Sequence, residues 1–149
     1  MENYISRFSL QKFILLPGNR TNVLDEMKKA SMFVLSSNFE GMSNALIEAM
    51  CLGLPCISTK VSGSTDLIND GANGLLIDLD DREQLFNAMK RIIEDEEFAL
   101  SLGMEATKIY SQLMLTKYKR MGSNYINRFM PTSWILILVR YDKIDKGLF

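Results

Sequence analysis

The chain has 149 residues, of which 47% are apolar, and this length and composition suffice for one globular domain with a buried core. It contains 17 basic and 18 acidic residues, so its net charge is close to zero. The absence of histidine excludes any mechanism in which this chain alone supplies an imidazole base, metal ligand or phosphoryl carrier.

Charge is distributed unevenly along the sequence. Residues 1–100 carry 9 basic and 15 acidic groups, whereas residues 101–149 carry 8 basic and 3 acidic groups. A basic end can favour contact with phosphate, with an acidic membrane surface or with a partner. These charges are spread out rather than clustered, which favours the simpler explanation of a solvated helix face.

The two cysteines and the apolar runs indicate a cytoplasmic protein. Cys51 and Cys56 fall in an apolar helix and an apolar strand, which is typical of buried thiols rather than of disulfides or metal ligands. The first residues lack the apolar core of a signal peptide, and the longest apolar run, WILILV at 134–139, is far shorter than the roughly 20 residues of a spanning helix. Peripheral contact with the inner face of the membrane stays open as an alternative.

Short runs of consecutive apolar residues predict strands buried on both faces, as in parallel sheets. These runs are residues 13–16 (FILL), 32–35 (MFVL), 55–58 (PCIS) and 74–77 (GLLI). Helix-like patterns precede, separate and follow them, at residues 2–8, 22–30, 43–52, 64–69, 96–113 and 115–128. Asp81 and Gln84 have the spacing of a capping box, which predicts a further helix after residue 81.

The alternation of strands and helices predicts an α/β fold: a Rossmann-like parallel sheet flanked by helices with right-handed crossovers. Because few strands are visible and the first comes within thirteen residues of Met1, we expect the back half of such a domain. We expect this partial domain to occupy residues 1–130. Residues 131–149 form a tail that the pattern does not assign.

The loop at residues 36–42 is the best candidate for a site, because ligands of open α/β sheets gather beyond the carboxyl ends of the strands. Gly41 lets the backbone approach a ligand closely, and Ser43 or Asn44 can cap the next helix. The free N–H groups at that helix start favour an anion, most plausibly phosphate. The sequence therefore predicts an anion site here.

Glu40 and Glu48 flank this predicted anion site. Glu48 lies one helical turn beyond Asn44 on the same face, so both carboxylates are expected near the helix start. Carboxylates repel phosphate but accept hydrogen bonds from vicinal hydroxyls, so a phosphate between two polyols suggests a nucleotide sugar. A structural alternative stays open, because glutamates near helix starts also suit the helix dipole.

Two nearby stretches carry a family resemblance: EGMSNALIEAMCLGLPCIST at residues 40–59 and SGSTDLINDGANGLLI at residues 62–77. They resemble the carboxyl-terminal, donor-binding domain of retaining nucleotide-sugar glycosyltransferases of group 1, which have the GT-B architecture. The resemblance extends over about residues 3–128 and includes the E-x7-E signature. It implies transfer of a hexose from a nucleoside diphosphate sugar to a glycan or lipid-linked acceptor, with no cofactor and no essential metal.

The resemblance also implies roles for single residues. Glu40 would contact hydroxyls of the donor sugar and is the candidate catalytic residue, and Glu48 would bind the ribose diol. The backbone of Gly41, Met42, Ser43 and Asn44 would contact the diphosphate, and the loop with Asn19 and Arg20 would border the base. Where the family usually has a glutamate, this chain has Asp66, for which helix-start capping and ligand binding are both open.

The chain also departs from the family. The arginine and lysine that neutralise the diphosphate, and the amino-terminal domain that binds the acceptor, are absent from the sequence. We therefore expect weak donor affinity, a separate acceptor-binding domain or subunit, and self-association through apolar surface left exposed. The alternatives are a non-catalytic nucleotide-sugar-binding module or truncated remnant, and an epimerase or hydrolase of the same architecture.

Three other signals are weaker. Asp78-Leu79-Asp80 spells a D-x-D triplet, but its place before a capped helix favours capping over metal binding. A glycosidase pair of carboxyls is disfavoured by the phosphate-ready helix start between the two glutamates. Tyrosines and lysines near residues 110–125 lack any recognised nucleic-acid module, so no nucleic-acid partner is expected.

Overall fold

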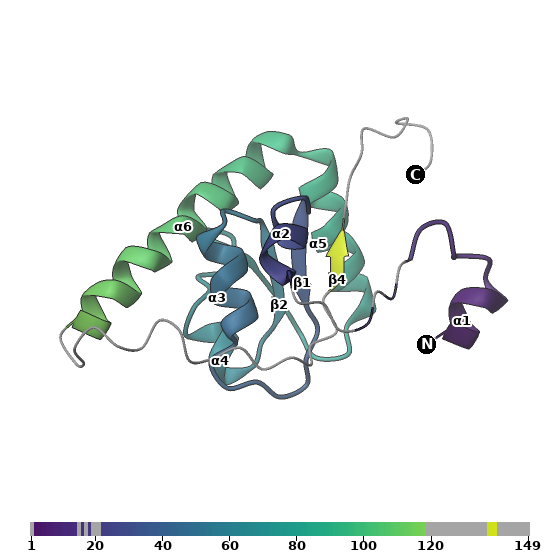
Figure 1. Ribbon diagram of the computed structural model, residues 1–149, viewed down its shortest axis with the longest axis horizontal. Coiled ribbons are helices and arrows are strands. Elements are labelled where there is room, and N and C mark those ends of the chain that lie inside the picture. Colours follow the sequence, from purple (N-terminus) through teal and green to yellow (C-terminus); the bar gives the residue numbers. More distant parts are fainter. Residues whose placement is uncertain (1, 15, 17, 19–21, 119–136, 140–149) are drawn as a thin grey trace.

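The computed structural model describes residues 2–14, 16, 18, 22–118 and 137–139. Three parallel strands form the centre of the molecule: β1 (Met32–Leu35), β2 (Cys56–Thr59) and β3 (Leu75–Ile77). A fourth strand, β4 (Ile137–Val139), pairs antiparallel with β1, and the order across the sheet is β3-β2-β1-β4 (Figure 1). The predicted Rossmann-like parallel sheet flanked by helices is confirmed.

The three parallel strands coincide with three of the four predicted apolar runs. All residues of β1 and β2 are buried, because helices cover both faces of the sheet. Phe33 and Leu35 contribute to the core on one face, and Met32 and Val34 to the core on the other. Two-sided burial is why consecutive positions in these strands, and not alternate ones, are apolar.

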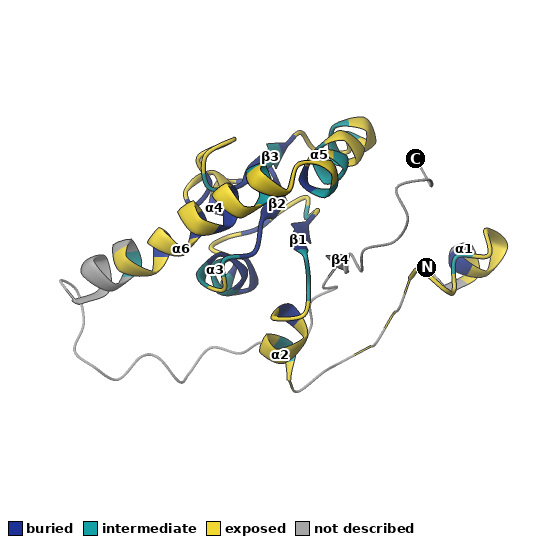
Figure 2. Ribbon diagram, turned by 90° about the horizontal axis from the view of Figure 1, so that it is seen from above, coloured by how far each residue is buried: buried dark blue, intermediate teal, exposed yellow. Residues whose placement is uncertain are grey.

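Helices lie on both faces of the sheet (Figures 1 and 2). α2 (Val23–Met27) and α3 (Asn44–Cys51) pack on the face of Phe33, and α5 (Arg82–Glu94) packs on the opposite face. The predicted helix after residue 81 is confirmed, and the Asp81 carboxylate caps it by accepting from the Gln84 N–H at 2.8 Å. The Gln84 side chain bonds instead with Asp78, so the second half of the expected capping box does not form.

The long helix α6 (Glu96–Tyr118) joins the two layers. Its first half packs with α5 through Phe98 and Leu102, and its second half packs with α3 through Ala106 and Ile109. A break between two helices near residue 114 was expected and is wrong, because α6 continues to Tyr118 and its sequence there contains neither glycine nor proline. The rest of the predicted helix at 115–128 lies outside the described residues.

The amino-terminal segment differs from the prediction. The expected helix is present as α1 (Glu2–Arg7), but Phe13, Ile14 and Leu16 are not part of a strand. Leu15 lies outside the described residues. The N–H groups of Phe13 and Ile14 both donate to the Leu10 carbonyl at 2.9 Å, so a local turn uses the donors that a strand would need. β4, from the unassigned tail, occupies the edge of β1 instead.

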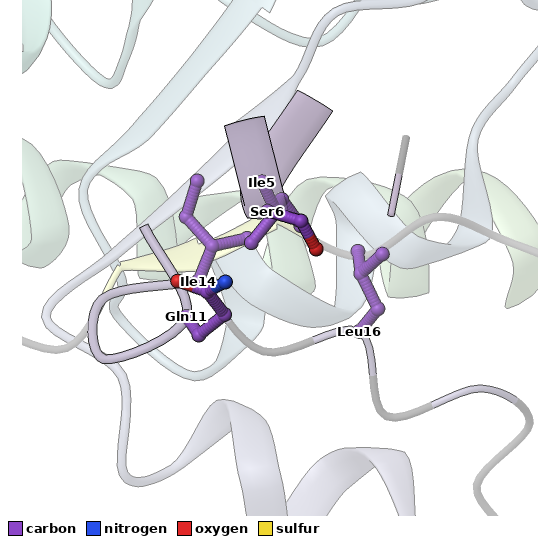
Figure 3. Close-up of a pocket in the computed structure, with 5 residues that line it drawn as sticks. All are labelled: Ile5, Ser6, Gln11, Ile14 and Leu16. Atoms are coloured by element: carbon purple, nitrogen blue, oxygen red, sulfur yellow. The ribbon is translucent and has the colours of Figure 1, made fainter. Parts of the chain in front are cut away.

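The same segment exposes apolar surface. Phe13 is 74% exposed, and Phe8, Ile14 and Leu16 are also exposed. α1 and this segment form a hollow of about 200 Å³. Figure 3 shows the residues that line it: Ile5, Ser6, Gln11, Ile14 and Leu16. α1 stands apart from the sheet in Figures 1 and 2, so this hollow is separate from the strand ends.

Within the described ranges, none of the helices combines the length and the hydrophobicity needed to cross a bilayer.

Gly103 should be essential for the packing of α6. A Cβ at this position would lie 2.2 Å from the Gly53 carbonyl oxygen, in the chain just before β2. We expect Gly103→Ala to lower the free energy of unfolding by about 1–3 kcal/mol, because backbone must move to admit the methyl group. Urea denaturation checks this, with the exposed Ser101→Ala in the same helix as the control. Equal stability of Gly103→Ala and the unaltered chain would show that α6 does not pack as described.

Candidate functional site

The loop at residues 36–42 connects the carboxyl end of β1 to the start of α3. Ser43 is the N-cap of α3: its backbone is extended, and its Oγ accepts from the Leu46 N–H at 3.4 Å. The first backbone bond of the helix runs from the Ile47 N–H to the Ser43 carbonyl. Within the described chain, no acceptor meets the N–H groups of Asn44 and Ala45, so they stay available to a ligand.

Glu40 is held inside this loop. The residue is only 9% exposed, and the Ser37 hydroxyl donates to its Oε1 at 2.8 Å. Ser37 is fixed in turn, because the Thr59 hydroxyl donates to its carbonyl. The sequence prediction missed both hydroxyl residues. The S-x-x-E spacing could have indicated the contact between Ser37 and Glu40. The contact of Thr59 with Ser37 could not be predicted in this way, because it depends on β2 lying beside β1.

Glu48 lies on α3, one turn beyond Asn44, and is partly buried. Burial raises the pKa of the Glu48 carboxyl above its ordinary value. Burial, and then the charge of Glu48, also raises the pKa of the Cys51 thiol one turn further on. Partial burial therefore places the charged carboxylate on α3 at an electrostatic cost.

The structure brings together most of the predicted site residues. Five of them are consecutive at the carboxyl edge of the sheet: Glu40, Gly41, Met42, Ser43 and Asn44. Glu48 follows in the second turn of α3. No hydrogen bond between the two glutamates is present in the described part of the chain. Asn19 and Arg20 lie outside the described residues, so their place at the base stays a prediction.

The short helix α4 (Ser62–Thr65) forms a second wall beside the loop. Gly63 N–H donates to the Glu40 carbonyl at 3.4 Å, which joins α4 to the loop directly. A helical turn was expected at residues 64–69 with Asp66 near its start. That expectation is wrong, because the turn begins at Ser62 and Asp66 is the C-cap of α4. Asp66 is exposed and does not cap a helix start.

A cleft of about 310 Å³ opens on the α5 side of the same edge. Ser36 and Asn38 of the loop line it, together with the residues that precede α5. Asp78 is engaged there, because its carboxylate pairs with Lys60 at 2.7 Å and accepts from Gln84 at 2.9 Å. Among the described residues, no group of three or more histidines, cysteines and acids is arranged to hold a metal ion.

Two apolar side chains project from the loop. Phe39 is 90% exposed and Met42 is 63% exposed, on either side of the buried Glu40. From the sequence, Met42 was named only for its backbone, and Phe39 was not singled out. Exposed aromatic and thioether groups beside a polar site provide flat, adaptable contact area for a ligand.

Residues 1–95 match a protein family described as glycosyl transferases group 1. The chain is 37% identical over 94 residues to the UDP-Gal:alpha-D-GlcNAc-diphosphoundecaprenol alpha-1,3-galactosyltransferase of Escherichia coli, covering 63% of this chain and 24% of that protein. It is 30% identical over 140 residues to the poly(glycerol-phosphate) alpha-glucosyltransferase of Bacillus subtilis, covering 92% of this chain and 20% of that protein. The chain thus spans a quarter or less of the length of these relatives.

Solved structures are similar over most of the chain. The Anabaena protein Alr3699/HepE in complex with UDP superposes with a TM-score of 0.71 and 26% identity, covering 74% of this chain and 31% of that one. The carboxyl-terminal domain of the glycosyl transferase group 1 family protein LpcC from Francisella tularensis superposes with a TM-score of 0.64 and 23% identity, covering 80% and 61%. The second likeness concerns the fold alone.

The raised pKa of Glu48 predicts how its replacement changes stability with pH. Since the folded chain binds this proton more tightly than the unfolded chain, stability falls as pH rises through the ordinary value of 4.5 towards the folded pKa. We expect Glu48→Gln to unfold at a higher urea concentration than the unaltered chain at pH 7. The gain should shrink as pH falls below 4.5. Glu97→Gln, exposed in the first turn of α6, should show no such gain. A pH-independent difference would contradict the assignment.

Proposed function

Because the chain belongs to the group 1 glycosyltransferase family, we propose that it binds the donor in a retaining GT-B glycosyltransferase, which moves a hexose from a nucleoside diphosphate sugar to a glycan or lipid-linked acceptor. One observation carries the proposal. In chain order, a helix start with free N–H groups comes between a buried, hydrogen-bonded carboxylate, Glu40, and a partly desolvated one, Glu48. Such an arrangement suits an anion that has hydroxyl-bearing groups on both sides.

In this proposal each group has one role. The diphosphate lies at the start of α3 and accepts from the backbone of residues 41–44. The Glu40 carboxylate accepts from hydroxyls of the hexose and faces the reacting carbon as the catalytic residue. The Glu48 carboxylate accepts from the ribose diol, and Asn19 and Arg20 border the base.

Uridine nucleotides are the first donors to test. The similar Anabaena protein has been solved with UDP and with UDP-glucose, and the E. coli relative acts on UDP-Gal. That relative also acts on a sugar linked to diphosphoundecaprenol, which supports a lipid-linked acceptor and peripheral contact with the membrane. The acceptor would be bound by a separate domain or subunit, and the exposed apolar residues near Phe13 would take part in association.

The proposed contacts set the scale of donor affinity. Hydrogen bonds to charged groups contribute roughly 1.5–3 kcal/mol each, and the helix start contributes about 0.3–2 kcal/mol. Lys60, a cation at the end of β2, is paired with Asp78 at 2.7 Å. Since association and ordering cost several kcal/mol, this chain alone should bind its donor with about millimolar affinity.

The two glutamates should differ in what they bind. We expect Glu48→Gln to lower the affinity for both UDP and UDP-glucose by roughly tenfold or more, because both ligands contain the ribose. Glu40→Gln should lower the affinity for UDP-glucose and leave the affinity for UDP unchanged, because only the hexose contacts this carboxylate. NMR titration of both ligands checks this, with Glu83→Gln, exposed in the first turn of α5, as the control. Identical curves for all variants would defeat the assignment.

Activity is tested separately from binding. Transfer of the hexose should appear when the chain is combined with a candidate acceptor-binding domain and an acceptor. Glu40→Gln should remove that transfer. Release of the nucleoside diphosphate without any acceptor would instead indicate hydrolysis or epimerisation.

A further inference from the structure

Gly63 lies against the backbone of the site loop. A Cβ at this position would lie 1.6 Å from the Gly41 carbonyl oxygen and 2.3 Å from the Gly41 carbonyl carbon. Its φ is not in the left-handed region, so an L-residue is compatible with the backbone conformation. Space, and not conformation, is therefore what requires glycine here.

α4 is fixed to the sheet and cannot easily retreat from the loop. Ser64 is fully buried, and its hydroxyl is 2.7 Å from the Ser58 hydroxyl of β2. The Ser58 hydroxyl in turn lies 3.3 Å from the Leu35 carbonyl at the end of β1, which it can reach as a donor. Val61 is also buried, and its N–H donates to the Thr59 carbonyl at 2.8 Å. A side chain at position 63 would therefore displace the loop rather than α4.

The loop, in contrast, has room to move. A Cβ at Gly41 would meet nothing within 4 Å, and Phe39 and Met42 are exposed on either side of Glu40. The contacts that fix Glu40 are the bond from the Ser37 hydroxyl to its carboxylate and the bond from the Gly63 N–H to its carbonyl. One of these two restraints therefore comes from α4.

We propose that Gly63 is a positioning residue of the donor site: by having no side chain it lets α4 hold the Glu40–Gly41 backbone, and so sets where the Glu40 carboxylate meets the donor sugar. This inference rests on the proposed function. An alanine would move the Gly41 carbonyl by at least 1.4 Å, the difference between 1.6 Å and the shortest tolerated distance of 3.0 Å. α3 has its own cap at Ser43, so Glu48 should keep its place.

The test compares Gly63→Ala with Gly103→Ala, which creates a matched backbone overlap, 2.2 Å from the Gly53 oxygen, away from the site. Both variants and the unaltered chain are titrated with UDP and UDP-glucose by NMR, at a temperature where each gives a folded spectrum. We expect Gly63→Ala to lose roughly tenfold or more of its UDP-glucose affinity and little of its UDP affinity. Gly103→Ala should keep the ratio of the two affinities, although it is destabilised.

The ligand-free spectra provide a second measurement. Amide resonances of residues 40–42 should shift in Gly63→Ala and stay in place in Gly103→Ala. Shifted resonances with an unchanged ratio of UDP-glucose affinity to UDP affinity would overturn the positioning role and leave the proposed function intact. If the unaltered chain binds neither ligand, both the proposed function and the role of Gly63 in donor binding are wrong. In that case the shifts of residues 40–42 still show whether α4 holds the loop.

A further variant covers the case in which Gly63→Ala does not fold. Ser64→Ala removes the hydroxyl contact between α4 and Ser58 without adding bulk. It should lower the UDP-glucose affinity in the same direction by a smaller factor, about threefold, because α4 then holds the loop less firmly. An unchanged ratio of UDP-glucose affinity to UDP affinity in Ser64→Ala would overturn the inference.

Discussion

The contact between α4 and the loop after β1 is the constraint on which the site depends. Glu40 leaves the sheet in a loop that has exposed apolar side chains and no apolar anchor of its own, so hydrogen bonds must hold it. The Ser37 hydroxyl and the Gly63 N–H donate to Glu40 directly. Three further hydroxyl residues hold the loop and α4 to the sheet: Ser58, Thr59 and Ser64. Buried hydroxyls in a network of this kind fix a unique geometry more than they add stability.

Several features of this edge reduce stability, and they lie in the loop after β1 or in α3. Glu48 is partly desolvated, Phe39 is almost fully exposed, and two N–H groups of α3 have no partner in the described chain. Asp81 caps α5, and no buried side-chain polar atom of the described residues lacks a hydrogen bond. A partly desolvated carboxylate close in sequence to free N–H groups of a helix start is a combination found at binding sites.

The parallel core could be predicted because strands buried on both faces have consecutive apolar residues, such as those of Met32–Leu35. The run at residues 13–16 has the same pattern, but Phe13 and Ile14 bond to the Leu10 carbonyl in a local turn. An apolar run indicates that burial is favourable but not which neighbouring element provides it. Glu40, Ser43 and Glu48 were found from motif and spacing, and their roles stay predictions. Gly63 could not be found that way, since its neighbour Gly41 is brought close only by the fold.

The contacts that fix Glu40 are all local in sequence. Ser37, Thr59, Gly63 and the Ser58–Ser64 pair lie within one β-α-β-α unit, and every bond among them joins residues between Leu35 and Ser64. Among the described residues, the bonds that hold the carboxylate therefore come from the loop after β1, from β2 and from α4. This chain spans a quarter or less of its relatives' length and still contains these restraints on the loop, because all of them join residues of one β-α-β-α unit.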